Sequence, residues 1–243
     1  MNLLLLEPGD FLPDGTARVS GRRFKQLEEV IKAAPGKLCK AGVLGGPVGS
    51  AEILAMAGEH AELRFIPHGE PPPPLKVILC CALPRPLTFS KIIHCAVTCG
   101  VKRICFFHSA KVEKSYWQSS RLADDAIREE VVLALEQCAD TIFPEISFHR
   151  RFRRFVEDEL PVIVPEKALE IFGSPGADVP VPAGAAHDGE VALVIGPEGG
   201  LNDFEEQTLR DHGFAGVTLG SRILRSEFAV NAFLSVLGVA KSL

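Results

Sequence analysis

The stretch that decides the fold is Ala192-Leu193-Val194-Ile195-Gly196-Pro197-Glu198-Gly199-Gly200-Leu201. Its first four residues are apolar and partly β-branched, which is typical of a buried parallel strand. A tight glycine-rich turn follows, and Asn202 or Asp203 can cap a helix after it. In open α/β sheets, ligands bind at the carboxyl ends of strands, where glycines let the backbone approach a ligand closely. We therefore expect a ligand site at 196–200, with a purely structural turn as the alternative.

A second strand end with a glycine follows at Val217-Thr218-Leu219-Gly220. Arg225 and Glu227 stand between the loop after it and an apolar helix. Two such strand ends, separated by one short helix, are expected to lie side by side and form one concave site. The structural alternative is that Glu227 favours a helix N-terminus and Arg225 pairs with a surface carboxylate. Neither turn carries a Walker or GxGxxG pattern, so a phosphate or dinucleotide site is poorly supported.

Around these turns, apolar runs alternate with longer helical patterns. Strands are expected at 75–83, 103–107, 146–148, 162–164, 191–195 and 216–219. Helices are expected at 87–100, 113–138, 152–159, 205–212 and 227–243, and an exposed loop at 173–189. The last helix is expected to bury Phe228, Ala232, Phe233, Val236 and Ala240. This alternation predicts an α/β fold with a parallel sheet.

The proline run Pro71–Pro74 separates this region from the N-terminal part of the chain. Four consecutive prolines favour an extended, semi-rigid linker. Before them, the pattern predicts strands at 37–44, 51–56 and 61–66 and one helix at 24–34. We therefore expect a small, mainly β domain at 1–70, a linker at 71–74 and an α/β domain at 75–243.

The composition excludes several classes of protein. The chain has 243 residues, of which 47% are hydrophobic, and a net charge of −5, so it is not intrinsically disordered. It has neither a signal-peptide pattern nor an apolar run long enough for a membrane span. Its seven cysteines include no CxxC pair, so a disulfide framework or a zinc site is not expected. Buried free thiols in a reducing cytoplasm are the better interpretation, and no metal is expected.

Basic residues are concentrated in two places although the whole chain is acidic. Residues 18–40 contain seven lysines or arginines and two glutamates. We expect nucleic-acid contacts from this segment, because arginine and lysine bind phosphates, and a solvated charged face is the alternative. The residues concerned are Arg18, Arg22, Arg23 and Lys25. The second place is 149–154, with four arginines, where RNA contact and a solvated charged face are equally supported. Tyr116 and Trp117 are expected to pack rather than to stack on bases.

The paired motif at 195–201 and 219–227 resembles the methyltransferases that modify N3 of a uridine in 16S ribosomal RNA, within the SPOUT superfamily. Further matches are at 82–85, 100–104 and 136–138, and at Pro144. The resemblance implies a trefoil-knotted parallel sheet with helices on both faces, a PUA-like RNA-binding β-barrel at 1–70 and a homodimer. It also implies S-adenosylmethionine as cofactor, 16S ribosomal RNA of the small subunit as substrate and a cytoplasmic location.

The resemblance also implies roles for individual residues. The cofactor would be held by Ile195, Gly196, Pro197, Glu198, Gly199, Gly200, Leu219, Gly220, Ile223, Leu224 and Arg225. Uridine N3 carries a proton at neutral pH, so transfer requires its loss and stabilisation of the resulting anion. The Arg225 guanidinium suits the negative charge on the uracil oxygens. Glu227 or Glu198 suits removal of the proton.

The chain departs from the family pattern at four places. A lysine and a glutamate of the pattern are missing around His94 and Thr98. Asp140 stands near the place of an arginine, and Phe228 replaces a hydroxyl-bearing residue. These departures motivate a second hypothesis, an RNA- or ribosome-binding protein that has lost catalysis on the same scaffold. A third hypothesis is an α/β enzyme that binds another small ligand at the same glycine turns.

Overall fold

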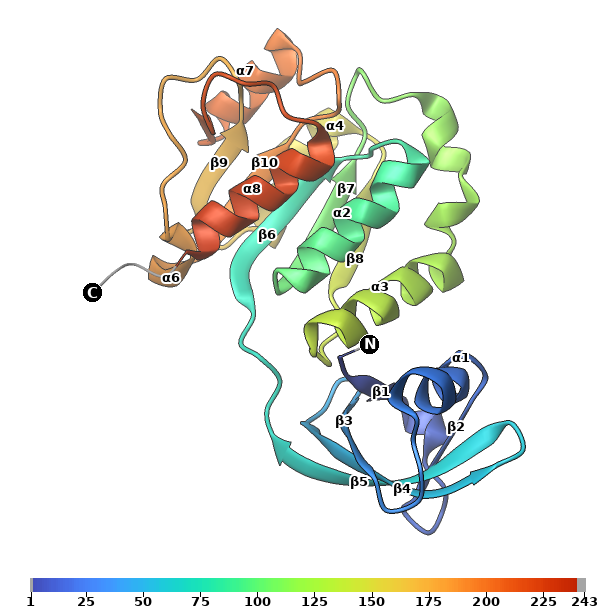
Figure 1. The fold of residues 1–243 in the computed structure, drawn as a ribbon. Helices are drawn as coiled ribbons and strands as arrows, with labels where there is room; N and C mark the ends of the chain where they lie inside the picture. Colours follow the sequence, from blue (N-terminus) through green and yellow to red (C-terminus); the bar gives the residue numbers. More distant parts are fainter. Residues whose placement is uncertain (1, 240–243) are drawn as a thin grey trace. The chain divides into compact units, whose positions relative to one another are not determined.

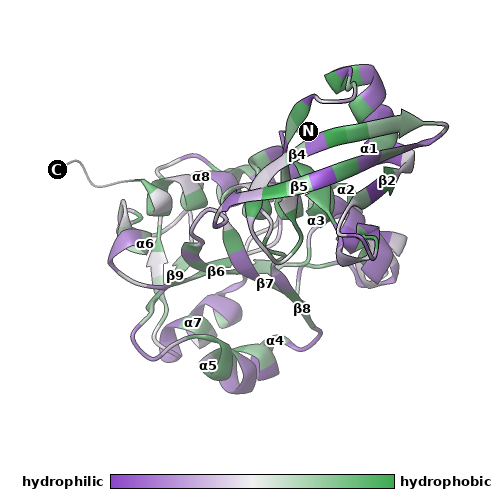
Figure 2. Cartoon of the chain, turned by 90° about the horizontal axis from the view of Figure 1, so that it is seen from below, coloured by the Kyte–Doolittle hydropathy of each residue, from purple (hydrophilic) through white to green (hydrophobic). Residues whose placement is uncertain are grey.

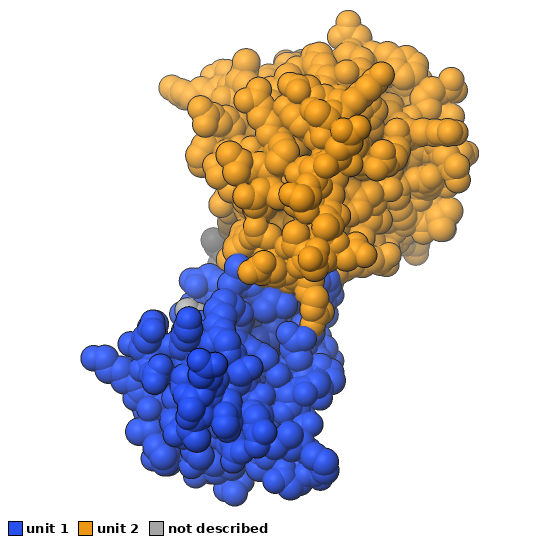
Figure 3. Space-filling model, turned by 90° about the vertical axis from the view of Figure 1, so that its right-hand side faces the viewer, with its two compact units in different colours: residues 1–73, 131–143 blue, residues 74–130, 144–243 orange. Residues whose placement is uncertain are grey.

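The computed structural model describes residues 2–239, which divide into two compact units (Figure 3). The first unit comprises residues 1–73 and 131–143, and the second comprises residues 74–130 and 144–243. The sequence pattern placed 131–143 with the α/β domain, whereas the structure groups it with the N-terminal residues. The end of the last expected helix, at 240–243, lies outside the described residues.

The first unit is built on a five-stranded sheet with the order β1-β3-β4-β5-β2. The strands are β1 (Leu4–Leu6), β2 (Ala17–Ser20), β3 (Leu38–Val43), β4 (Val48–Ala57) and β5 (His60–Gly69). β1 and β3 are parallel, and the other neighbours are antiparallel. A short 3-10 turn (Pro8–Asp10) precedes β2, and α1 (Gly21–Gln26) continues into a π-turn (Leu27–Ile31). Phe24 and Leu27 pack from this helical segment into a core with Leu6, Ile53 and Leu63, which explains why the segment is amphipathic.

One glycine of this sheet cannot take a side chain. A Cβ at Gly49 in β4 would overlap the carbonyl oxygen of Ile66 and lie 2.9 Å from Pro67 Cα, both backbone atoms of β5. We expect Gly49→Ala to lower the free energy of unfolding by about 3 kcal/mol, because the strands must separate. The control is Gly46→Ala, whose Cβ meets nothing closer than 3.5 Å. Urea denaturation of both variants measures the difference, and equal midpoints would contradict the prediction.

The second unit is built on a six-stranded sheet with the order β11-β9-β10-β6-β7-β8, in which all neighbours are parallel. The strands are β6 (Leu75–Ala82), β7 (Val101–Phe107), β8 (Glu145–His149), β9 (Leu169–Gly173), β10 (Val191–Ile195) and β11 (Ala215–Val217). All five residues of β10 are buried, as expected for a central strand. The predicted α/β fold with a parallel sheet is therefore confirmed.

Helices cover both faces of this sheet. They are α2 (Pro86–Thr98), α4 (Phe152–Arg154), α5 (Leu160–Ile163), α6 (Ala185–Asp188), α7 (Asp203–Asp211) and α8 (Ser226–Gly238). A further helix, α3 (Asp124–Cys138), belongs to the second unit up to residue 130 and to the first unit from residue 131. α2 and α8 pack against one another on one face, and α4, α5 and α7 lie on the other (Figure 1, Figure 2). Figure 2 shows α7 as largely hydrophilic, in keeping with a surface helix. No helix within residues 2–239 combines the length and the apolar character needed to cross a bilayer.

Several details differ from the sequence-based predictions, including β2, which was not expected. The stretch 162–164 is not a strand: α5 occupies Leu160–Ile163, with a proline in its first turn and Val162 85% exposed. The helix expected from 113 begins only at Asp124, after short 3-10 turns at Lys114–Gln118 and Ser120–Leu122. The expected loop at 173–189 contains α6, and strand β9 directly before it was missed. Phe228 is 60% exposed instead of buried, because α8 turns Val230, Phe233, Leu234 and Leu237 towards the sheet.

A histidine–carboxylate pair in this unit makes the stability depend on pH. His149 Nδ1 at the end of β8 lies 2.5 Å from Glu159 Oε2, at the end of a π-turn (Phe155–Glu159). Burial alone would lower the pKa of His149, but hydrogen bonds with Cys105 and Glu159 raise it overall. Since the folded-state pKa lies above the unfolded one, the stabilisation is complete below about pH 6.5 and is lost as the pH rises through the folded-state value.

We therefore expect the urea concentration at the unfolding midpoint to decrease as the pH is raised from about 6 to about 8.5, because His149 loses its proton and its attraction to Glu159. Glu159→Gln should flatten that part of the profile, because the neutral amide no longer favours protonated His149. The loss of the Arg154–Glu159 ion pair in the same variant does not depend on pH in this range. Parallel profiles for the two proteins would contradict this assignment.

Candidate active site at the carboxyl edge of the sheet

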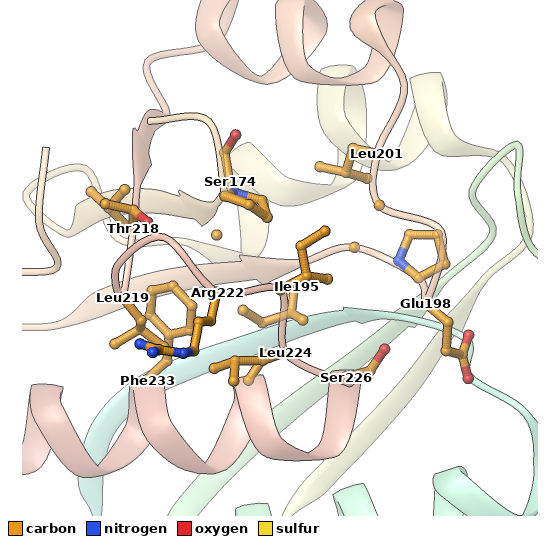
Figure 4. Close-up of a pocket in the computed structure, with 18 of the residues that line it drawn as sticks. Ser174, Ile195, Glu198, Leu201, Thr218, Leu219, Arg222, Leu224, Ser226 and Phe233 are labelled. Carbon is orange, nitrogen blue, oxygen red and sulfur yellow. The ribbon is translucent and has the colours of Figure 1, made fainter. Parts of the chain in front are cut away.

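Three parallel strands end at one cavity of about 290 Å³ (Figure 4). The strands are β9, β10 and β11, whose carboxyl ends meet at the same edge because they run parallel. The two glycine turns recognised in the sequence therefore line one cavity, but their strands are not neighbours. β9 lies between β10 and β11 and contributes Gly173, Ser174 and Pro175 to the lining.

All the residues expected at the cofactor line this cavity except Arg225. They are Ile195, Gly196, Pro197, Glu198, Gly199, Gly200, Leu219, Gly220, Ile223 and Leu224. Eleven residues that were not expected at the cofactor also line the cavity: Gly173, Ser174, Pro175, Leu201, Glu206, Val217, Thr218, Arg222, Ser226, Ala229 and Phe233. Five of these come from β9, α7 and α8, and only the fold brings them to the two turns.

The apolar wall of the cavity depends on two glycines. A Cβ at Gly173 would lie 3.0 Å from Phe233 Cε2 and 3.2 Å from Ile195 Cδ1. A Cβ at Gly196 would lie 3.0 Å from both the backbone nitrogen and Cγ of Leu201. Such distances are shorter than ordinary carbon contacts, so a larger residue at either position would push its neighbours by a few tenths of an ångström.

Polar groups are placed at two opposite ends of the cavity. At one end, Glu206 of α7 accepts a hydrogen bond from Ser174 Oγ at 3.1 Å and pairs with Arg210 at 2.9 Å. At the other, a Glu198 carboxylate oxygen accepts the backbone N–H of Arg85 at 3.3 Å. In Figure 4 the Glu198 carboxylate and Ser174 lie on different sides of Ile195. A ligand with an apolar body and cationic or hydroxyl groups suits this distribution.

A buried carboxylate fixes the glycine turn at 196–200. Glu205 is 2% exposed and accepts hydrogen bonds from Ser109 Oγ (3.1 Å), Ala110 N–H (2.7 Å) and Asn202 N–H (3.0 Å). Asn202 in turn accepts the N–H of Glu205 at 2.8 Å, which completes a capping box at the start of α7. The predicted cap is thus Asn202, and the glycine turn is tied to the loop after β7.

Arg225 and Glu227 lie at the start of α8, beside the lining residue Ser226. Arg225 is the N-cap residue, with an extended backbone and an exposed side chain. No ion pair of Arg225 is found among residues 2–239. Glu227, whose side chain is 12% exposed, lies 3.5 Å from Lys91 Nζ of α2. Neither residue lines the cavity, so both lie at its rim.

The basic residues expected to contact RNA differ in how they are engaged. Arg18 pairs with Glu62 at 2.8 Å, and Arg22 holds the buried carboxylate of Glu136 at 2.7 Å and 3.1 Å. Arg23 is bound to both oxygens of Asp10 and to the Leu5 carbonyl. Lys25 is exposed. Arg23, at 19% side-chain exposure, is the least available of the four for phosphate.

The positions that depart from the family pattern have local partners. His94 Nε2 lies 2.7 Å from Glu130 Oε2. Asp140 is 3% exposed and accepts the N–H of Ile142. Within the described range, no cluster of three or more histidine, cysteine or acidic side chains is arranged to hold a metal ion.

Comparison with known proteins bears on this site. Residues 71–238 match the model of the RNA methyltransferase domain family. The chain is 26% identical over 243 residues to ribosomal RNA small subunit methyltransferase E of Treponema pallidum (strain Nichols), covering 97% of this chain and 90% of the relative. It is 30% identical over 169 residues to the protein of the same name from Mesomycoplasma hyopneumoniae (strain 232), covering 66% and 68%.

Solved structures share the fold at lower identity. A methyltransferase from Legionella pneumophila, determined with bound SAM, superposes with a TM-score of 0.76 at 23% identity, over 97% of this chain and 96% of the other. Ribosomal RNA small subunit methyltransferase E from Neisseria gonorrhoeae, bound to S-adenosyl methionine, gives 0.70 at 21% identity, over 96% and 95%. The match over 71–238 includes all three strand ends of the cavity. The chain belongs to the RNA methyltransferase domain family.

Proposed function

We propose that this protein is an S-adenosylmethionine-dependent methyltransferase that methylates N3 of a uridine in 16S ribosomal RNA. The observation that carries the proposal is the convergence of three strand ends on one cavity in a chain of the RNA methyltransferase family. The relatives named above are ribosomal RNA methyltransferases, and two similar structures contain the cofactor.

The lining of the cavity fits S-adenosylmethionine. Ile195, Leu219 and Leu224 offer apolar surface for the adenine, and the glycine turn at 196–200, which lines the cavity, offers peptide groups for its edge. Glu206 offers an acceptor for hydroxyl or ammonium groups, and Glu198 tolerates a cation. When bound, the cofactor would supply a methyl group activated by its positively charged sulfonium.

The residues at the rim would act on the RNA base. The exposed Arg225 guanidinium can stabilise negative charge on the uracil oxygens once the N3 proton is lost. Glu227 beside it, or Glu198 in the lining, can accept that proton. Since Arg225 lies outside the lining, we assign it to the base and not to the cofactor.

Further features follow from the family resemblance. We assign a PUA-like RNA-binding domain to 1–70, a linker to 71–74 and a trefoil-knotted methyltransferase domain to 75–243. The five-stranded sheet and the exposed Lys25 support the first of these assignments. A homodimer acting on 16S ribosomal RNA of the small subunit, in the cytoplasm, completes the proposal.

Two measurements test the function. Calorimetry with S-adenosylmethionine should show binding, which Gly173→Leu should abolish by filling the cavity next to Phe233. Reverse transcription of 16S ribosomal RNA from cells lacking the protein should lose a stop at one uridine, because N3 methylation blocks base pairing. The purified chain should restore that stop. Absence of cofactor binding would overturn the proposal, and binding without methylation would favour the noncatalytic RNA-binding protein.

A further inference from the structure

A second concave site lies at the carboxyl ends of β7 and β8, away from the cavity described above. This aromatic groove has a volume of about 380 Å³. It is lined by Trp117, Gln118, Ser119, Leu122, Ala123, Phe148 and Arg150. All of these residues belong to the second unit, and none of them takes part in the proposed methyl transfer.

The aromatic side chains of the groove are fixed by contacts with neighbouring side chains of the second unit. Trp117 Nε1 donates a hydrogen bond to His108 Nδ1 at 2.9 Å, and its ring stands edge-on to Phe148, with centroids 6.3 Å apart. Phe148 stacks on the fully buried Phe106 at 5.7 Å, yet it is 37% exposed. An exposed aromatic surface fixed in this way loses little conformational entropy when it binds a planar group.

The groove also carries positive charge that no carboxylate neutralises. The Arg150 guanidinium lies 4.8 Å from the centroid of the Trp117 ring. Arg153 and Arg154 are paired with Glu157 and Glu159, whereas within residues 2–239 no ion pair of Arg150 is found. No acidic residue lines the groove. Aromatic faces beside unneutralised guanidinium groups are typical of sites that bind single-stranded nucleic acid.

We propose that the aromatic groove binds an unpaired nucleotide of the RNA substrate. The base stacks against Trp117 and Phe148, Gln118 and Ser119 offer hydrogen bonds to its edge, and Arg150 pairs with a phosphate. The Arg150 side chain that lies over the Trp117 ring is exposed, so it can turn towards a phosphate. The choice of RNA as ligand rests on the proposed function.

The position of the groove suits a nucleotide near the reacting one. β10, which borders the methyl-donor cavity, is separated from β8 by β6 and β7, and all four strands end at the same edge. Three strand spacings amount to roughly 14 Å. A single-stranded segment of a few nucleotides spans this distance, so one strand can occupy both sites.

Trp117 is the only tryptophan of the chain, so its fluorescence reports on this groove alone. Single-stranded hexauridylate, titrated into the full-length protein at low salt, should quench the fluorescence saturably. A duplex of the same length should not, because its bases are already stacked. Arg150→Gln should weaken the affinity about 10- to 100-fold, because it removes the charged partner of the phosphate and leaves the aromatic side chains in place.

The matched control is Arg103→Gln, which removes the same charge near the amino end of β7, where Arg103 pairs with Glu145. It should bind like the wild type. In a second assay, the anisotropy of labelled hexauridylate should show that Trp117→Phe keeps the affinity within about threefold, since an aromatic face remains. Trp117→Leu should lose it. If Trp117→Leu does not fold, the Arg150→Gln comparison decides, because this substitution removes no buried atoms.

Two results would overturn the inference: RNA that binds without quenching Trp117, or an Arg150→Gln affinity equal to that of the wild type. Calorimetry with S-adenosylmethionine on the same samples separates this inference from the proposed function. If RNA quenches Trp117 but the protein does not bind the cofactor, the groove is an RNA site and the proposed methyltransferase function is wrong. If the protein methylates RNA but Arg150→Gln binds RNA as tightly as the wild type, the proposed function stands and the assignment of the groove is wrong.

Discussion

Replacing Arg225 with alanine is expected to slow methyl transfer about 10²- to 10³-fold, the loss usual for one donor to a developing negative charge. The affinity for S-adenosylmethionine should stay within about twofold of wild type, because the side chain lies outside the cavity lining. Single-turnover methylation at saturating cofactor measures the first quantity, and calorimetry measures the second. Arg225→Lys should recover part of the rate, since the charge remains without the forked geometry.

The matched control is Arg222→Ala, three residues earlier in the same loop. Arg222 lines the cavity, and in Figure 4 its side chain extends beside Leu219 and Phe233. Its removal should weaken cofactor binding and leave the rate at saturating cofactor largely intact. The two arginines thus separate a base contact from a cofactor contact. A near-normal rate for Arg225→Ala would rule out its role in transfer.

Glu205→Ala should lower the free energy of unfolding by about 2–4 kcal/mol, since it removes one half of the capping box and leaves buried donors without an acceptor. The donors are Ser109 Oγ and the N–H groups of Ala110 and Asn202. Cofactor affinity should fall as well, because the same carboxylate holds the turn at 196–200 in place. Thermal or urea unfolding, with and without the cofactor, measures both effects.

Two variants serve as controls for this result. Asp203→Ala removes an exposed acidic residue from the same first turn of α7 and should cost only about 0.3–1 kcal/mol. Glu205→Gln keeps one acceptor oxygen, so its loss of unfolding free energy should lie between those of Glu205→Ala and Asp203→Ala. If Glu205→Ala lowered the free energy of unfolding no more than Asp203→Ala does, the hydrogen bonds of the buried Glu205 carboxylate would not contribute to stability.

The strand–turn–helix unit at 191–211 was predictable, because a buried strand, a glycine turn and a capping residue each leave a local signal. β9 left none: Glu170 interrupts its apolar residues and a proline- and glycine-rich segment follows it. The reverse error occurred at 162–164, where β-branched residues suggested a strand but flanking prolines favour the single helical turn that forms.

Long-range partners limited what could be predicted of the site. The spacing of Asn202 and Glu205 signals a cap, but their further partners Ser109 and Ala110 come from a loop about 95 residues earlier. Likewise, Ser174 reaches the cavity because β9 pairs with both β10 and β11, and Phe233 reaches it from α8, where it packs next to Gly173. Local sequence patterns identified the two turns, whereas the other lining residues could be placed only from the order of the strands in the folded sheet.

The membership of residues 131–143 in the first unit has a consequence for biosynthesis. Arg22 is satisfied by Glu136, and the N–H of Leu3 and the carbonyl of Gly46 bond to Glu136 and Thr141. A nascent chain therefore cannot complete its N-terminal unit when residue 73 leaves the ribosome. Roughly twice that length must emerge before residues 131–143 are available, so the unit whose synthesis begins first completes its folding late.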